Sequence, residues 1–209
     1  MDNHDDDSES QGQFTAVTRR TVVAGTALAG LASLAGCLGD DDERPEPITI
    51  ESGRACDNCT MEIVDYPGPV GLAFYDEPAT VLESEGESDD AGGLDRPAQF
   101  CSSLCTYTFV FQNEEDASPA ATYLTDYSSV EYEVRGDGED AEITSHVEAD
   151  AFALADECRL VVDSDVNGAM GRSIIGFTDV DDATAFEAEY GGDLYDHDEI
   201  EAELVMSLM

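Results

Sequence analysis

The sequence predicts an α+β protein made of two small, related modules that pack as one compact unit. Two observations lead to this prediction. Residues 48–127 contain strand-like segments, then one helix, then a closing strand, and residues 128–209 repeat that order. Short segments of this kind cannot each bury a core alone, so the two modules are expected to pack together.

The first module begins with a short strand expected at 48–52. A turn at Pro67-Gly68-Pro69 precedes a second strand at 70–75. Residues 83–96 show no apolar periodicity, and we expect them to form a solvated loop.

The first helix is expected to open just after Phe100 and to run to about residue 113. Ser102 or Ser103 is the predicted N-cap, because a serine hydroxyl accepts from the free N–H groups of the first turn. A closing strand is expected at 120–126.

The second module repeats these signals with a different hairpin. Strands at 132–134 and 143–146 flank the turn Gly136-Asp137-Gly138. The remaining elements are β-rich segments at 159–163 and 173–177, an amphipathic helix at 179–190 that ends at Gly191-Gly192, a strand at 194–195 and a terminal helix at 200–208.

Residues 1–36 are predicted to be an export signal. The pair Arg19-Arg20 is a twin-arginine signature, and the small-residue run that follows is too short for a good membrane span. The run ends at a lipobox-like sequence whose Cys37 would become the lipidated first residue. Residues 37–47 would form an acidic tether. The sequence therefore predicts a lipid-anchored protein at the extracytoplasmic face of the cell membrane.

The charge of the chain is extreme, with 49 acidic residues against eight basic ones and a formal net charge of −41. Molar salt shortens the Debye length to roughly 3 Å, which suppresses repulsion between such charges. We therefore expect a halophilic source. The alternative is a surface that binds calcium or a cationic partner. Nucleic acid is not an expected partner, since little basic surface is available to neutralise phosphates.

The chain contains six cysteines and five methionines, whose sulfur atoms are candidate metal ligands. Cys56, Cys59 and Met61 form a CxxCxM cluster, and Cys101 and Cys105 lie four residues apart across the predicted helix start. Positions i and i+4 share one face of a helix, so these two thiols can point at the same spot. Thiolates and thioethers select soft metals, above all Cu(I).

Three other interpretations of these sulfurs stay open. Cys56 and Cys59 could form an extracytoplasmic disulfide. The four thiols could form a closed structural Zn(II) site. Met61 could simply fill a gap in the core, and Met170, in a turn close to two glycines, is a better candidate ligand than Met61. Cys158 and His146 are predicted to be structural, and His197 to lie at the surface unless it completes a Cu(I) site.

Five segments of the chain form a recognisable combination. They are CxxCxM at 56–61, Phe100-Cys101 with Cys105, the run 123–127, the run 167–173 around Met170, and the Phe177…Asp182-Ala183…Phe186…Gly191-Gly192 pattern. Together they resemble the NosL family of copper-binding lipoproteins from about Cys56 to about Ile200. The first half also resembles the TRASH/YHS heavy-metal modules, in which a CxxC precedes an FCxxxC helix entry.

The resemblance implies a chaperone that holds Cu(I) outside the cytoplasm and passes it to apo nitrous oxide reductase, with that enzyme's assembly transporter as a further partner. It also implies two related ββαβ-type units. This chain departs from the family at two positions: Thr60 stands where glycine is usual, and Ala169 stands where proline usually precedes the Met-Gly pair.

Catalysis is not predicted, because no set of nucleophile, base and orienting residue is recognisable. Our hypothesis is Cu(I) held by two or three sulfurs, from Cys56, Cys59 and Met61 or Met170. The alternatives are a structural zinc-binding surface lipoprotein and a thiol-disulfide redox protein. The redox alternative is weaker because residues 60–64 are expected to continue as a strand, whereas a thioredoxin-like CxxC leads into a helix.

Overall fold

A computed structural model describes residues 44–82 and 94–209, which belong to one compact unit. The predicted signal at 1–36, the lipidation site Cys37 and most of the predicted loop at 83–96 lie outside the described residues. Within the described part of the chain, no helix is long and apolar enough to cross a membrane.

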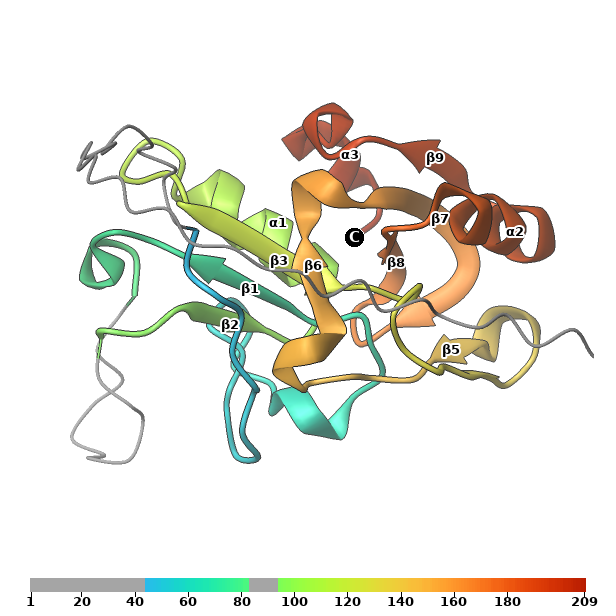
Figure 1. The fold of residues 1–209 in the computed structure, drawn as a ribbon, viewed down its shortest axis with the longest axis horizontal. Coiled ribbons are helices and arrows are strands. Elements are labelled where there is room, and N and C mark those ends of the chain that lie inside the picture. The colour runs from blue at the N-terminus through green and yellow to red at the C-terminus, as the bar shows by residue number, and fades with distance from the viewer. Residues whose placement is uncertain (1–43, 83–93) are drawn as a thin grey trace, which may run out of the picture. The chain divides into compact units, whose positions relative to one another are not determined.

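The first sheet has four strands, and each pairs antiparallel with its neighbours (Figure 1). The strand order is β2-β1-β3-β6, with β1 at Gly71–Phe74, β2 at Ala98–Phe100, β3 at Ala121–Thr125 and β6 at Phe152–Leu154. Helix α1, Ser103–Gln112, follows β2 directly.

The second sheet is mixed, because β5 pairs parallel with β7 while the other pairs are antiparallel. Its order is β4-β5-β7-β8 with β9 also paired to β7; the strands are Val134–Arg135, Glu142–Ile143, Arg159–Gly168, Gly171–Phe177 and Asp193–Tyr195. Helices α2, Val180–Tyr190, and α3, Ala202–Ser207, complete this half.

Short 3-10 helices connect the main elements. They are η1 Ile63–Asp65, η2 Pro78–Thr80, η3 Gly138–Asp140, η4 Ala149–Ala151, η5 Ala155–Glu157 and η6 His197–Glu199.

The same topology occurs twice, which confirms the predicted α+β class with two related ββαβ units. In the first half, β1 lies between β2 and β3, and α1 connects those two outer strands. In the second half, β7 lies between β8 and β9, and α2 connects them. Strand β6 belongs to the second half of the sequence but pairs with β3, so the first sheet includes one strand from the second half. The boundary at residues 127 and 128 stays a prediction.

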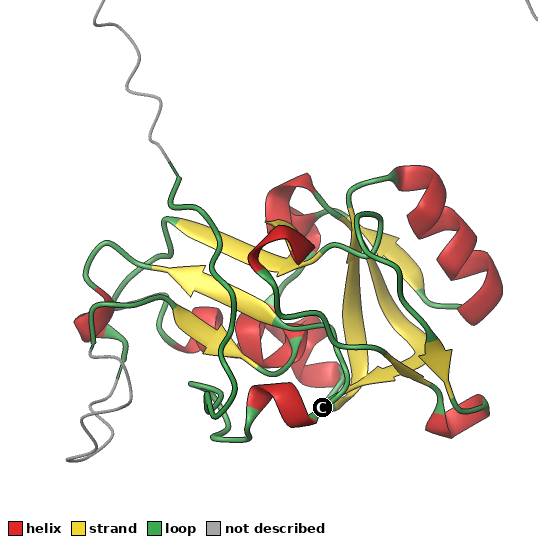
Figure 2. Ribbon diagram, turned by 60° about the horizontal axis from the view of Figure 1, so that its bottom comes forward, coloured by secondary structure: helices red, strands yellow, loops and turns green. Residues whose placement is uncertain are grey.

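Helix α1 links the two halves through its packing. It contacts β1 and β2 of the first sheet and β8 and α3 of the second half. Figure 2 shows helices lying beside the strands of both sheets. A helix buried on several sides needs apolar residues around much of its circumference. Accordingly, its buried side chains include Leu104, Cys105, Tyr107 and Phe109. The sulfur-rich start of α1 therefore belongs to a rigidly packed element.

Most predicted elements are present, although the hairpin strands expected at 132–134 and 143–146 are the shorter β4 and β5. Two further expectations were wrong. No strand forms at 48–52, where the backbone N–H of Ile50 instead donates to Val147 O at 2.8 Å. Residues 60–64 do not continue as a strand either: Glu62 makes one isolated bridge with Ala55, and η1 follows. Strands β2 and β6 were not predicted, because three-residue strands are too short to show a period of two.

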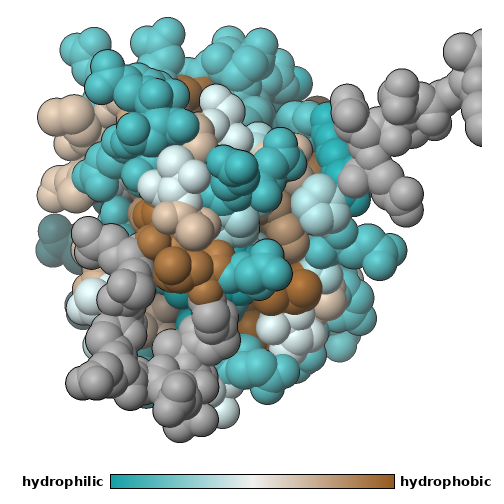
Figure 3. All heavy atoms as spheres, turned by 90° about the vertical axis from the view of Figure 1, so that its left-hand side faces the viewer, coloured by the Kyte–Doolittle hydropathy of each residue, from teal (hydrophilic) through white to brown (hydrophobic). Residues whose placement is uncertain are grey.

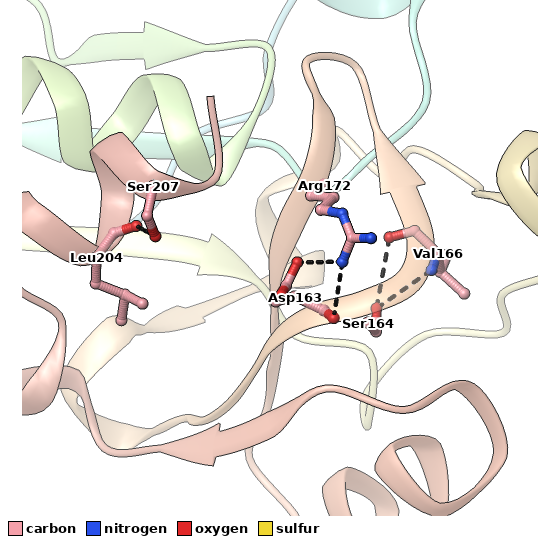
Figure 4. A network of polar contacts seen from close by, with 6 residues as sticks. All are labelled: Asp163, Ser164, Val166, Arg172, Leu204 and Ser207. Carbon is pink, nitrogen blue, oxygen red and sulfur yellow. Dashed lines mark hydrogen bonds and ion pairs between the residues drawn. The ribbon is translucent and has the colours of Figure 1, made fainter.

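The hairpin of β7 and β8 carries the predicted ligand Met170 in its turn. Its register shifts between Val162 and Asn167, where Ser164 Oγ contacts the backbone of Val166 (Figure 4). Beside this bulge, the guanidinium of Arg172 pairs with the Asp163 carboxylate across the two strands. Bulges bend a strand, so this one sets the direction of the hairpin tip.

The surface is largely hydrophilic, as the high content of acidic residues leads one to expect. On the face shown in Figure 3, hydrophilic residues cover most of the area that is not drawn in grey. The halophilic source remains a prediction from the charge.

Candidate metal centre

Four cysteines meet at one point between the loop 54–63 and the start of α1. The Sγ atoms of Cys56, Cys59, Cys101 and Cys105 all lie within 4.8 Å of one another. Cys59 Sγ is 3.4 Å from Cys101 Sγ, and Cys101 Sγ is 3.8 Å from Cys105 Sγ. The structure thus brings together two cysteine pairs that lie far apart in the sequence.

Backbone hydrogen bonds close the first pair into a tight loop. The N–H of Cys56 donates to Met61 O, and the N–H of Thr60 donates back to Cys56 O, both at 2.8 Å. This reversal places Thr60 at φ +65°, in the left-handed region that favours glycine. The site is therefore built on a backbone conformation that is unfavourable for a β-branched residue.

The second pair is positioned by the junction of β2 and α1. Ser102 is the N-cap, as predicted, and its side chain accepts from the N–H of Cys105 at 3.0 Å. Cys101 precedes the cap and Cys105 lies in the first helical turn. The positive end of the helix dipole favours negative charge at this terminus, so it favours thiolates there.

Burial is uneven across the four thiols. Cys56, Cys101 and Cys105 are buried, with exposed fractions of 1%, 0% and 2%, whereas Cys59 is only partly buried. An ion in this cluster would therefore be enclosed by three buried sulfurs and would be reached from the side of Cys59.

Hydrogen bonds among the thiols lower the pKa of one cysteine and raise the pKa of two others. The Cys101 thiol, followed by that of Cys105, lowers the pKa of Cys56 strongly. The pKa of Cys101 is raised by its hydrogen bonds to Cys105 and Cys56 and by burial. At Cys105 the contact with Cys101 lowers the pKa, but the hydrogen bond to Cys56 and burial outweigh it. These directions favour a thiolate at Cys56 and protonated thiols at Cys101 and Cys105, whose protons metal binding would displace.

The two predicted thioether ligands lie in different surroundings. Met61 is partly buried and packs against the hydrophobic core that contains three of the cysteines. Met170 is 39% exposed in the turn between β7 and β8, and its neighbour Ala169 packs against that same core. The hairpin tip therefore borders the thiol-containing core and leaves Met170 open to solvent.

The remaining candidates are built into other parts of the fold. Cys158 is buried in a second core with Leu160 and Ile174. His197 is not simply a surface residue, because its Nδ1 is 2.9 Å from Tyr107 Oη and burial lowers its pKa. His146 Nε2 lies 3.3 Å from Thr144 Oγ1, in agreement with a structural role.

Sequence reasoning missed one pair of residues next to the cluster. Asp57, inside the CxxC loop, forms a bidentate ion pair with Arg96. The signal was present as a carboxylate between two cysteines in a chain with few cations, but its partner is 39 residues away. Pairing over that distance cannot be derived from local spacing.

The sulfur geometry fits a metal ion better than a disulfide. All five cysteines in the described residues are free thiols, and the 3.4 Å contact is far longer than a disulfide bond of about 2.05 Å. A tetrahedral ion with metal–sulfur bonds of about 2.3 Å separates its sulfurs by about 3.8 Å. The cluster is therefore close to the shape that a d¹⁰ ion such as Cu(I) or Zn(II) requires.

Three comparisons relate the chain to known proteins. The model of the NosL family matches residues 47–205. The copper-binding lipoprotein NosL of Stutzerimonas stutzeri is 29% identical over 187 residues, covering 87% of this chain and 82% of that protein. The crystal structure of the copper chaperone NosL from Shewanella denitrificans matches with a TM-score of 0.54 and 27% identity, covering 74% of this chain and 94% of that one.

Proposed function

Because the chain belongs to the NosL family, we propose that it is an extracytoplasmic, lipid-anchored copper(I) chaperone that delivers copper to nitrous oxide reductase. The observation that carries the proposal is the cluster of four thiols within 4.8 Å. Thiolates and thioethers prefer Cu(I) over harder ions. The relatives from two bacteria are described as a copper-binding lipoprotein and a copper chaperone.

The cargo would be held at the partly exposed end of the cluster. Cys56 and Cys59 supply thiolates, and Met61 and Met170 are the candidate thioethers. Cys101 and Cys105 lie close enough to share the ion. Because Cys59 is the most accessible of the four thiols, a ligand of the acceptor can bind from its side while the donor ligands leave one at a time.

The proposed location comes from sequence features beyond the site, and the proposed partners come from the family resemblance. Cys37 would carry the lipid, and the acidic segment 37–47 would hold the folded unit off the membrane. The acceptor would be apo nitrous oxide reductase, with its assembly transporter at the same membrane. Folded export by the twin-arginine route suits a protein that must present intact thiols outside the cytoplasm.

An anaerobic competition experiment tests whether the protein binds Cu(I) and passes it on. Reduced protein is titrated with Cu(I) in the presence of a chromogenic chelator and then mixed with apo nitrous oxide reductase. The proposal predicts uptake of Cu(I) against the chelator and subsequent appearance of copper in the reductase. Failure to compete for Cu(I) would rule out the chaperone, whereas uptake without transfer would rule out this acceptor.

A structural zinc site is the second candidate, and the burial of three of the four thiols favours it. Closed structural sites use four thiolates, and three of the thiols here are 2% exposed or less. Metal analysis of anaerobically purified protein distinguishes the two candidates: stoichiometric zinc that resists Cu(I) supports this one, and its displacement by Cu(I) supports the chaperone.

A further inference from the structure

The CxxC loop is bonded to β2 and to Arg96, just before it, by an ion pair and two further hydrogen bonds. Asp57 Oδ1 accepts from Arg96 Nη2 at 2.6 Å, and Asp57 Oδ2 accepts from Arg96 Nη1 at 2.7 Å. The same Oδ2 accepts from the backbone N–H of Gln99 at 2.7 Å, and the N–H of Asp57 donates to Gln99 O at 2.9 Å. Both carboxylate oxygens are thus engaged, so Asp57 is not available as a metal ligand.

This pair is more buried than four other arginine ion pairs in the described part of the chain. The side chains of Arg96 and Asp57 are 13% and 10% exposed. In the pairs of Arg44, Arg135, Arg159 and Arg172, exposed fractions run from 30% to 70%. Salt screens exposed pairs but affects buried ones much less. A buried bidentate pair therefore keeps its geometry in the concentrated salt that the acidic composition suggests.

Burying this pair has a cost that its contribution to folding does not obviously offset. Desolvating two charges can exceed their attraction, and Arg96 Nε is buried without a hydrogen-bond partner. An apolar contact would close the same space with less penalty. The fork of a guanidinium on a carboxylate instead provides a defined orientation, which an apolar contact does not.

The ion pair of Asp57 and Arg96 lies next to both pairs of cysteines in the sequence and the fold. Asp57 lies between Cys56 and Cys59, and Gln99 lies two residues before Cys101. The ion pair and the two Gln99 contacts therefore connect one cysteine pair to the other. They join the loop to the segment that leads into Cys101, whose Sγ lies 3.4 Å from Cys59 Sγ.

We propose that Asp57 and Arg96 are positioning residues of the metal site: they hold the two cysteine pairs at binding distance before the ion arrives. Preorganisation of this kind raises affinity, because the cost of ordering the ligands has already been met in folding. The inference rests on the proposed function only in taking the four-thiol cluster as the metal site. It assigns a role to two residues that provide no ligand atom.

The test measures Cu(I) affinity in Asp57→Asn and Arg96→Met by anaerobic chelator competition. Asp57→Asn keeps the shape of the side chain and removes its charge. Each variant is expected to bind Cu(I) at least tenfold more weakly, and the double variant no more weakly than the worse single variant, because the two residues act as one unit. The control is Arg135→Met, which removes an equal charge from an ion pair that is 70% exposed and should not change the affinity.

Two further readouts separate positioning from general destabilisation. The ultraviolet thiolate-to-Cu(I) charge-transfer band should change in Asp57→Asn even at temperatures where circular dichroism shows full folding. Arg96→Lys, which keeps the charge but loses the fork, should recover only part of the affinity. It also replaces Arg96→Met if that variant does not fold.

The outcomes distinguish this inference from the proposed function. If the wild-type protein takes up no Cu(I), the proposed function fails and the variants are not needed. If the wild type binds Cu(I) and folded Asp57→Asn and Arg96→Lys bind it equally well with an unchanged spectrum, the positioning role is wrong while the chaperone proposal stands.

Discussion

The Sγ atom of Cys59 lies 3.4 Å from that of Cys101, although the two residues are 42 positions apart in the sequence. The first belongs to the loop closed by Cys56 and Met61, and the second lies between the end of β2 and the N-cap of α1. A metal ion at this point would be bound by both segments at once.

Cys101→Ser should lower Cu(I) affinity if both cysteine pairs share the ion. We expect a loss of at least about tenfold, equivalent to about 1.4 kcal/mol, because serine does not replace a soft thiolate. Cys158→Ser is the matched control, since Cys158 is a buried thiol in a different core. Competition titration measures both, and equal affinity in the two variants would restrict the site to the CxxC loop and the methionines.

Met170→Leu should weaken Cu(I) binding much more than Zn(II) binding. The thioether is a soft ligand that suits Cu(I), and leucine preserves the size of the exposed side chain. Met206→Leu is the control, because Met206 is 73% exposed on α3. Parallel titrations with both metals provide the measurement. Similar losses for the two metals would count for a zinc site.

Thr60→Gly should raise the free energy of unfolding by about 0.5–2 kcal/mol. Thr60 has φ +65°, and relief of a β-branched residue in that region, about 1–3 kcal/mol, exceeds the added chain entropy of glycine, about 0.5–1 kcal/mol.

The control for this substitution is Thr122→Gly in β3, where the backbone is extended and glycine should destabilise the protein. Urea unfolding of metal-free protein in molar salt compares the three chains. A less stable Thr60→Gly variant would show that contacts of the threonine side chain outweigh its backbone conformation.

Cys158→Ser should reduce the loss of stability at alkaline pH. Burial, followed by the nearby charges of Asp126 and Glu157, raises the pKa of Cys158 to about 12 from an ordinary value of 9.0. Between these values the unfolded chain releases the proton and the folded chain keeps it. Stability from this group is therefore complete below pH 9 and falls as pH rises towards 12, by up to about 1.4 kcal/mol per pH unit.

The measurement is the free energy of unfolding of wild type and variant at several pH values above 8. Other buried groups, such as Tyr75 with its pKa raised to about 12 by burial, keep part of the slope in both proteins. The difference between the two curves isolates the thiol. Parallel curves would mean that Cys158 titrates alike in the folded and unfolded chains.

Local signals predicted much of the fold. The serine cap of α1, the hairpin around residues 136–138 and the glycine end of α2 all depend on residues close in sequence, and all are present. The three-residue strand β6 escaped prediction because it exists only through its pairing with β3. The strand expected at 48–52 was wrong because alternation alone does not supply a partner strand.

The sequence by itself determined which chemistry this protein can perform, since closely spaced thiols and thioethers select soft metals wherever they are folded. It also determined the repeated order of strands and helix, because periodicity and turn residues act locally. Only the tertiary structure decided that all four cysteines meet, that Met170 stays exposed, and that Asp57 reaches Arg96. Those contacts depend on the pairing of β1 with β2 and on the packing of α1, which join residues far apart in the chain.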